Sequence, residues 1–198
     1  MGVTFRDLAC QAGVEAEVLT LYSTAFPRDE RREPDEMLRI LKADPAFHCR
    51  VGLDAATGAL LSFVSYWDFG KFHYIEHLAV EPGMRGQGVG SATIRDFIAN
   101  VAARIVLEVE PPVDTTTRKR VDFYRTLGFT LWSSFGYIQP PYSPASSPVE
   151  LCLMTYGPFT LAGLSDASAT IAAQVYHRYY NPSRGFETEC QHCRDITT

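Results

Sequence analysis

Apolar residues recur along the chain with two different periods, and the two kinds of segment alternate. Apolar positions three and four residues apart predict helices over residues 13–26, 34–41, 91–103, 115–127 and 167–180. Short apolar runs bounded by turn residues predict strands over residues 46–53, 59–67, 73–80, 104–110, 129–139 and 149–156. Helices interleaved with strands favour a mixed α/β sheet.

Composition places the chain among globular proteins. It has 198 residues, of which 46% are hydrophobic and 12% aromatic, so it can form a substantial core. We expect one main domain over residues 1–160 and a C-terminal helical tail over residues 161–198. The net charge of -5 does not provide the basic face that nucleic-acid binding normally needs, so we expect no nucleic-acid partner.

Targeting and membrane segments are not expected. No apolar run approaches the roughly 20 residues of a membrane helix. The first twenty residues include the charged residues Arg6, Asp7, Glu15 and Glu17, which leaves no apolar signal core. The five cysteines are odd in number and scattered, which is typical of reduced thiols. We therefore expect a cytoplasmic protein with no membrane partner.

The C-terminal stretch CQHC contains three residues of the types that bind zinc, namely Cys190, His192 and Cys193. A structural zinc site usually needs four ligands, and no second Cys/His pair lies at a suitable spacing. We therefore expect no metal site.

The stretch VEPGMRGQGVGSA, from Val80 to Ala92, joins a predicted strand to a predicted helix. The first amides of a helix lack intrahelical partners and carry partial positive charge, and glycines let a phosphate approach them closely. Arg85 adds a full charge. The spacing differs from that of the nucleotide-triphosphatase loop and of the dinucleotide-binding loop. The glycines alone fit a phosphate cradle and a tight turn equally well.

Further motifs separate these two interpretations. RGQGVG resembles the pattern Gln/Arg-x-x-Gly-x-Gly/Ala of the GNAT N-acetyltransferase superfamily, with Arg85, Gly88 and Gly90 at the specified positions. IVLEVE and FYRTLGF follow in the order found in that family, and the resemblance covers about residues 14–156. It implies an α/β (α+β) GNAT fold, with a mixed, mostly antiparallel sheet of six to seven strands, splayed central strands and flanking helices.

The resemblance also implies acetyl-CoA as cosubstrate. Its diphosphate would lie on the amides of the glycine turn, and its pantetheine arm would lie along the preceding strand. An N–H near Val80 would polarise the acetyl carbonyl. Many members place an asparagine where this chain has Thr117. The implied cofactor-binding residues are Leu78, Ala79, Val80, Arg85, Gly86, Gln87, Gly88, Val89, Gly90, Ser91 and Thr117.

Acetyl transfer to an amine requires two proton movements. A carboxylate can take a proton from the amine, and Glu108, Glu76 and Glu110 are the candidates. We favour Glu108, with Glu76 close behind, although each of them fits a hydrogen-bonded carboxylate at a strand end equally well. Tyr124, in FYRTLGF, occupies the position of the general acid in many members. Its alternative role is packing against the cofactor.

These features predict an enzyme, an acetyl-CoA-dependent acyltransferase that acts as a monomer or homodimer. It would move an acetyl group to a primary amine of a small molecule by direct attack in a ternary complex. One alternative is a peptide or protein acetyltransferase acting on an N-terminus or a lysine, and another is a non-catalytic acyl-CoA-binding regulator. Six aromatic residues either line the acceptor site or belong to the core: Tyr22, Phe26, Trp67, Phe72, Tyr137 and Tyr142.

Overall fold

The computed structural model describes residues 2–11, 13–100, 104–142 and 146–179. It divides the chain into two compact units. The first comprises Met1–Pro27 and Glu33–Ile105, and the second comprises Arg28–Arg32 and Val106–Thr198. The boundary expected between a domain over residues 1–160 and a tail over residues 161–198 stays a prediction.

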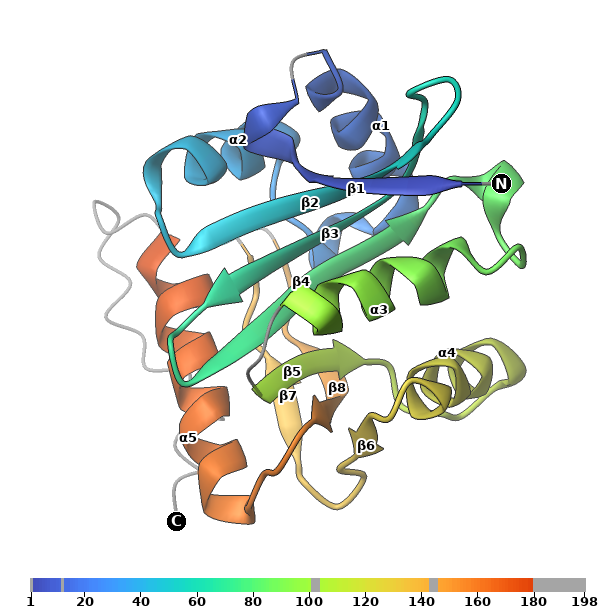
Figure 1. Ribbon diagram of the computed structural model, residues 1–198. Coiled ribbons are helices and arrows are strands. Elements are labelled where there is room, and N and C mark those ends of the chain that lie inside the picture. The colour runs from blue at the N-terminus through green and yellow to red at the C-terminus, as the bar shows by residue number, and fades with distance from the viewer. Residues whose placement is uncertain (1, 12, 101–103, 143–145, 180–198) are drawn as a thin grey trace. The chain divides into compact units, whose positions relative to one another are not determined.

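The first unit is built on four antiparallel strands in the order β1-β2-β3-β4 (Figure 1). These strands are β1 (Val3–Asp7), β2 (Phe47–Asp54), β3 (Leu60–Asp68) and β4 (Phe72–Val80). The helices are α1 (Glu15–Ala25), α2 (Pro34–Ala43) and α3 (Val89–Asn100). Two short 3-10 turns, η1 (Leu8–Cys10) and η3 (Pro82–Met84), complete it together with the start of β5 (Arg104–Val109).

Helices cover both faces of this sheet. Side chains alternate between the faces of a strand, so even and odd positions of β3 meet different helices. The Tyr66 ring lies 4.7 Å from the ring of Phe97 on α3, whereas the Phe63 ring lies 6.2 Å from that of Tyr22 on α1. Both faces of β3 are therefore buried, which explains its nearly continuous apolar sequence.

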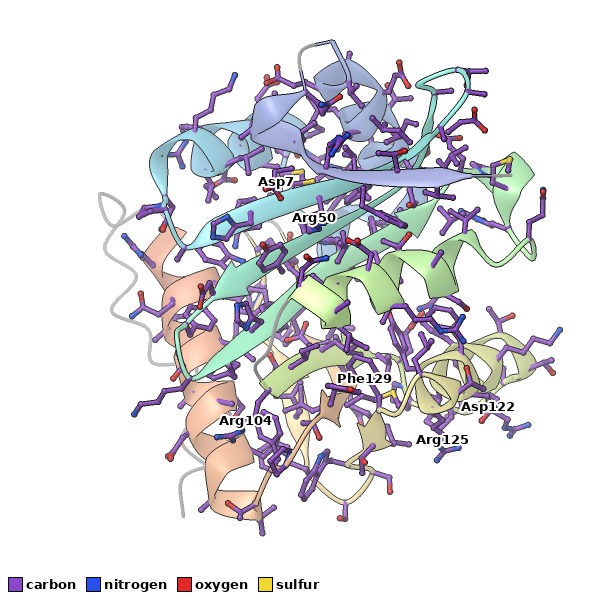
Figure 2. The ribbon with its side chains drawn as sticks, viewed as in Figure 1. Asp7, Arg50, Arg104, Asp122, Arg125 and Phe129 are labelled. Atoms are coloured by element: carbon purple, nitrogen blue, oxygen red, sulfur yellow. The ribbon has the colours of Figure 1, made fainter. Side chains whose placement is uncertain are left out.

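Arg50 joins three elements of the first unit. Its guanidinium lies 2.7 Å from the Asp96 carboxylate on α3 and 3.3 Å from the Asp7 carboxylate on β1. Figure 2 shows Asp7 and Arg50 on the neighbouring strands β1 and β2. Arg50 is largely shielded from solvent. Its two ion pairs therefore connect α3 and the edge strand β1 to β2.

The second unit is organised around β8 (Val149–Tyr156), which lies next to β5. Its first residues pair with β7 (Tyr137–Gln139) and its last residues with β6 (Thr130–Leu131), both antiparallel. The helices are α4 (Thr115–Thr126) and α5 (Leu161–Ile171). A π-helical turn, η4 (Ala172–Tyr176), and a 3-10 turn, η5 (His177–Tyr179), continue α5, and η2 (Arg28–Glu30) is a further 3-10 turn of this unit.

The α4 helix begins at a capping box. The Asp114 carboxylate accepts the amide of Thr117 at 2.8 Å, and the Thr117 hydroxyl accepts the amide of Asp114 at 3.1 Å. Two orphan donors of the helix start are thereby satisfied. At the other end, Gly128 has φ +90°, which only glycine adopts readily. Both ends of the helix that carries Tyr124 are thus defined locally.

The elements differ from those expected in three places. The edge strand β1 was not predicted, and the strand predicted over residues 129–139 is divided into β6 and β7 by a turn at residues 132–136. The last helix begins at Leu161 because Thr160 caps the amide of Gly163 at 3.1 Å. The ends of the helices predicted over residues 91–103 and 167–180 lie outside the described residues. No helix in the described part of the chain is long and apolar enough to cross a membrane.

Replacing Asp114 with alanine removes the cap of α4, and we expect a lower midpoint of thermal unfolding at pH 7. Backbone and hydroxyl hydrogen bonds to its carboxylate, chiefly from the Thr117 amide, hold the pKa of Asp114 below its ordinary value. This stabilisation is complete above the ordinary carboxyl pKa of about 4 and is lost as the pH falls through the lower pKa of the folded state.

The difference in midpoint between Asp114→Ala and the unsubstituted protein should therefore shrink below about pH 4 in calorimetry. Asp114→Asn is the control, because it keeps the acceptor oxygen without the charge. An equal difference at pH 7 and at pH 2 would contradict this account.

Candidate functional site

The turn between β4 and α3 depends on two glycines with positive φ. Gly86 has φ +75° and Gly88 has φ +83°, and a Cβ built on either would meet no atom within 4 Å. The requirement for glycine is therefore conformational and does not come from crowding. The space above the turn is open, so a ligand can approach its backbone.

The amides at the start of α3 are available to such a ligand. The first helical hydrogen bond of the turn runs from the Ala92 amide to the Gly88 carbonyl at 2.9 Å. The amides of Val89, Gly90 and Ser91 precede it and have no acceptor within the helix. Together with the helix dipole, these donors favour an anion such as a phosphate.

Two side chains of the turn donate hydrogen bonds to backbone carbonyls that precede it. The Arg85 guanidinium donates to the Val80 carbonyl at 3.3 Å, and the Gln87 amide donates to the Gly83 carbonyl at 2.8 Å. Both side chains are exposed. The positive charge of Arg85 thus lies at the surface beside the open backbone, which fits a group with several phosphates.

Strand β4 contains a bulge at Glu76. His77 pairs with Ser65 and Ile75 pairs with Tyr66, so Glu76 is an extra residue with no register partner on β3. Its carboxylate accepts the indole N–H of Trp67 at 2.7 Å. Pairing is regular over residues 77–80. Glu76 is therefore a half-buried, hydrogen-bonded carboxylate, as either of its predicted roles requires.

Glu108 on β5 accepts hydrogen bonds from two tyrosines of the same unit. The Tyr176 hydroxyl donates to Oε2 at 2.9 Å, and the Tyr137 hydroxyl donates to Oε1. Tyr137 and Tyr176 are buried, while Glu108 keeps partial exposure. The two phenols therefore hold both carboxylate oxygens of Glu108 in place.

Glu110, the third candidate base, pairs with Arg120 of α4. This ion pair is partly exposed and links the end of β5 to α4. That pairing favours a structural role for Glu110.

Tyr124 lies in an aromatic environment on α4. Its ring lies 4.9 Å from that of Phe123 and 5.5 Å from that of Phe129, which is labelled in Figure 2. Burial raises the pKa of Tyr124 to about 12, against a smaller lowering by Arg120. The hydroxyl therefore stays protonated at neutral pH, as a proton donor must.

Thr117 is occupied at the cap of α4. Its hydroxyl accepts the Asp114 amide at 3.1 Å and donates to the Asp114 carbonyl at 3.2 Å. Sequence reasoning did not identify this capping box. A contact of Thr117 with the cofactor stays a prediction.

The structure brings the predicted site residues together in two groups. Residues 76, 78–80 and 85–91 belong to β4 and the turn of the first unit, whereas Glu108, Thr117 and Tyr124 belong to the second unit. The six predicted aromatic residues are all buried except Phe26, which is half-buried. Sequence reasoning missed Tyr176, because a tyrosine 68 positions from Glu108 gives no local signal.

The CQHC stretch with Cys190, His192 and Cys193 lies outside the described residues. Within the described ranges, no group of three or more His, Cys, Asp or Glu residues is arranged to hold a metal ion.

The chain is similar in sequence to known proteins. A model of the family described as the acetyltransferase (GNAT) family matches residues 16–129. YjbC of Bacillus subtilis (strain 168), named as an acetyltransferase, is 32% identical over 117 residues. These residues make up 58% of this chain and 57% of YjbC, so the match spans little more than half of that relative's length.

Solved structures have the same fold. A GNAT-family protein from Bacteroides thetaiotaomicron has a TM-score of 0.79 and 28% identity, covering 87% of this chain and 98% of that chain. A variant of the SpeG spermidine N-acetyltransferase from Vibrio cholerae has a TM-score of 0.57 and 18% identity, covering 77% and 92%. The predicted mixed α/β fold class is therefore confirmed. Because the family model covers more than half of its residues, the chain belongs to the acetyltransferase (GNAT) family, a family of acyltransferases that generally use acetyl-CoA.

Proposed function

We propose that this protein transfers the acetyl group of acetyl-CoA to a primary amine of a small molecule. The observation that carries the proposal is the open turn at Gly86 and Gly88, which exposes the amides at the start of α3 directly after β4. Family membership gives this anion site a specific interpretation, namely a site for the diphosphate of acetyl-CoA.

The residues of the turn fit that group. The amides of residues 85–91 would bind its phosphate oxygens, with Arg85 supplying a full charge nearby. The backbone of Leu78, Ala79 and Val80 would bind the pantetheine arm, and an N–H near Val80 would stabilise the oxyanion. Acetyl-CoA supplies the activated thioester. The chain supplies the positioning and the proton movements.

Direct transfer needs a neutral amine. A lysine-like amine has a pKa of about 10 and is mostly protonated at neutral pH, so a carboxylate must help to remove its proton. The amine nitrogen then bonds to the acetyl carbon, the C–S bond breaks, and the sulfur takes up a proton. Glu108 is our preferred base, because hydrogen bonds from Tyr137 and Tyr176 hold both of its carboxylate oxygens in place.

Tyr124 is our candidate for the group that donates to the departing sulfur. Its raised pKa of about 12 keeps the hydroxyl protonated. A thiol has a pKa of about 8.5, below that of the phenol, so Tyr124 would stabilise the developing thiolate by donating a hydrogen bond to it, and solvent water would supply the proton that the sulfur takes up.

The proposal is tested by incubating the protein with acetyl-CoA and measuring free thiol release with a panel of small amines and with peptides that carry a free N-terminus or a lysine. Turnover with small amines supports the proposal. Turnover with peptides alone would replace it with peptide acetylation, and binding of acetyl-CoA without turnover would replace it with a regulatory role.

Gly88→Ala should weaken acetyl-CoA binding about 10-fold, because a Cβ would project into the open space where phosphate oxygens approach the amides. It should also lower the free energy of unfolding by about 1 kcal/mol, because alanine disfavours positive φ. Calorimetric titration and denaturant unfolding measure the two effects.

Gly58→Ala is the matched control, since Gly58 also has positive φ, at +76°, with open space at its Cβ position. It should reproduce the loss of stability and leave acetyl-CoA affinity unchanged. Equal affinity for Gly88→Ala and Gly58→Ala would exclude the phosphate site.

Glu108→Gln should lower kcat/KM about 100-fold by removing the base. Because the amine loses its own proton at higher pH, the rate of this variant should rise about tenfold per pH unit below the amine pKa. Steady-state kinetics between pH 7 and pH 10 measure this recovery. A larger loss in Glu76→Gln, with the same recovery, would assign the role to Glu76 instead.

Tyr124→Phe should lower kcat by about 10- to 100-fold and leave the dissociation constant of acetyl-CoA nearly unchanged, because it removes the donor to the departing sulfur. The control is Tyr156→Phe, a second Tyr-to-Phe change in the same unit. Full activity in Tyr124→Phe would remove the assigned role.

A further inference from the structure

The C-terminal helical segment reaches Glu108 from beyond the residues that the family model matches. The family match ends at residue 129, whereas α5 and η4 span residues 161–176. Leu164, Ala167, Ile171 and Val175 are almost fully buried, so this segment forms part of the core of the second unit. Its last buried residue is Tyr176, whose hydroxyl donates to Glu108 at 2.9 Å.

A π-helical turn directs this tyrosine. Over Ala172–Tyr176 the hydrogen bonding widens, and the His177 amide donates to the carbonyls of both Ala172 and Ala173. Such a turn contains one more residue than an α-helical turn and changes the direction of the side chains that follow, often at functional sites. Arg32 donates to the carbonyl of Val175, next to Tyr176, and so binds the turn directly.

The ring of Tyr176 is held from a second side. It lies 4.9 Å from the ring of Tyr142. The Arg32 guanidinium lies 4.9 Å from the centre of the Tyr142 ring, in cation–π geometry. Arg32 is 2% exposed and Tyr176 is 1% exposed, so little water competes for these contacts. Arg32, Tyr142 and Tyr176 therefore form a connected, buried support that ends at the Glu108 carboxylate.

Two tyrosines on different oxygens fix the plane of that carboxylate. Tyr137 donates to Oε1 and Tyr176 to Oε2, so rotation of the carboxylate would break a hydrogen bond. The lone pairs of both oxygens then have a defined direction. A proton acceptor that is held in place before the substrate arrives lowers the entropic part of the barrier.

We propose that Tyr176 is a positioning residue, which the C-terminal segment contributes to hold the Glu108 carboxylate in the orientation that accepts a proton from the acceptor amine. This inference rests on the proposed function. It makes the segment over residues 161–176 part of the catalytic apparatus.

The test is Tyr176→Phe, which removes the hydroxyl and keeps the ring. We expect kcat to fall about 10-fold, corresponding to one hydrogen bond to a charged group, with the dissociation constant of acetyl-CoA unchanged. The same change in a Glu108→Gln background should have little further effect, because residues that act through one another are not additive. Tyr156→Phe is the matched control.

Two results would overturn the inference while the proposed function stands: unchanged kcat in Tyr176→Phe, or losses that multiply in the double variant. Absence of wild-type turnover with every amine and peptide would instead overturn the proposed function, and the positioning role with it. If Tyr176→Phe is misfolded by circular dichroism, Tyr142→Leu replaces it. That variant removes the ring that contacts both Tyr176 and Arg32 and keeps the Tyr176 hydroxyl; it should lower kcat without adding to Glu108→Gln, whereas an additive loss would again overturn the inference.

Discussion

The backbone conformation at Gly86 and Gly88 is the constraint on which the proposed acetyl-CoA site depends. Both residues have φ values that other amino acids adopt only with strain, and they turn the chain from β4 into α3 within a few residues. A Cβ built at either position would meet no atom within 4 Å, so a ligand has room to approach the backbone of the turn. The same backbone conformation therefore connects β4 to α3 and leaves room for a ligand at the amides of the turn.

The proton-transfer groups depend on a different kind of support. Glu76 and Glu108 each accept aromatic donors, an indole in one case and two phenols in the other. Aromatic donors bring apolar surface with them, which keeps competing water away from the carboxylate and strengthens its interactions. Apolar surroundings act on Tyr124 as well: burial raises the pKa of its hydroxyl, which therefore stays protonated. The chemistry of each group is therefore determined by what it is buried among.

Local patterns predicted much of the fold. The helical stripe before Pro27 became α1, and the glycine turn was found where expected. Strand β1 was missed because VTFRD is short and exposes its polar end, so that only pairing with β2 defines it. The turn WSSFG interrupts the run that predicted one continuous strand, and the Phe135 amide closes this turn by donating to the Trp132 carbonyl at 3.1 Å. Glu108 was identified from its motif, but its partner Tyr176 depends on tertiary packing that no local pattern records.

Glu76 and Tyr176 share a feature that has an evolutionary consequence. Each lies at an extra residue in an otherwise regular element, at the bulge in β4 and at the π-helical turn after α5. Loss of one residue would restore regular pairing in the strand and rotate the helix end by about 100°. Deletion of one residue beside Glu76 or Tyr176 would therefore change the direction of that side chain, even though every functional residue is kept. In relatives of this chain, the length of these two segments carries information that residue identity alone does not.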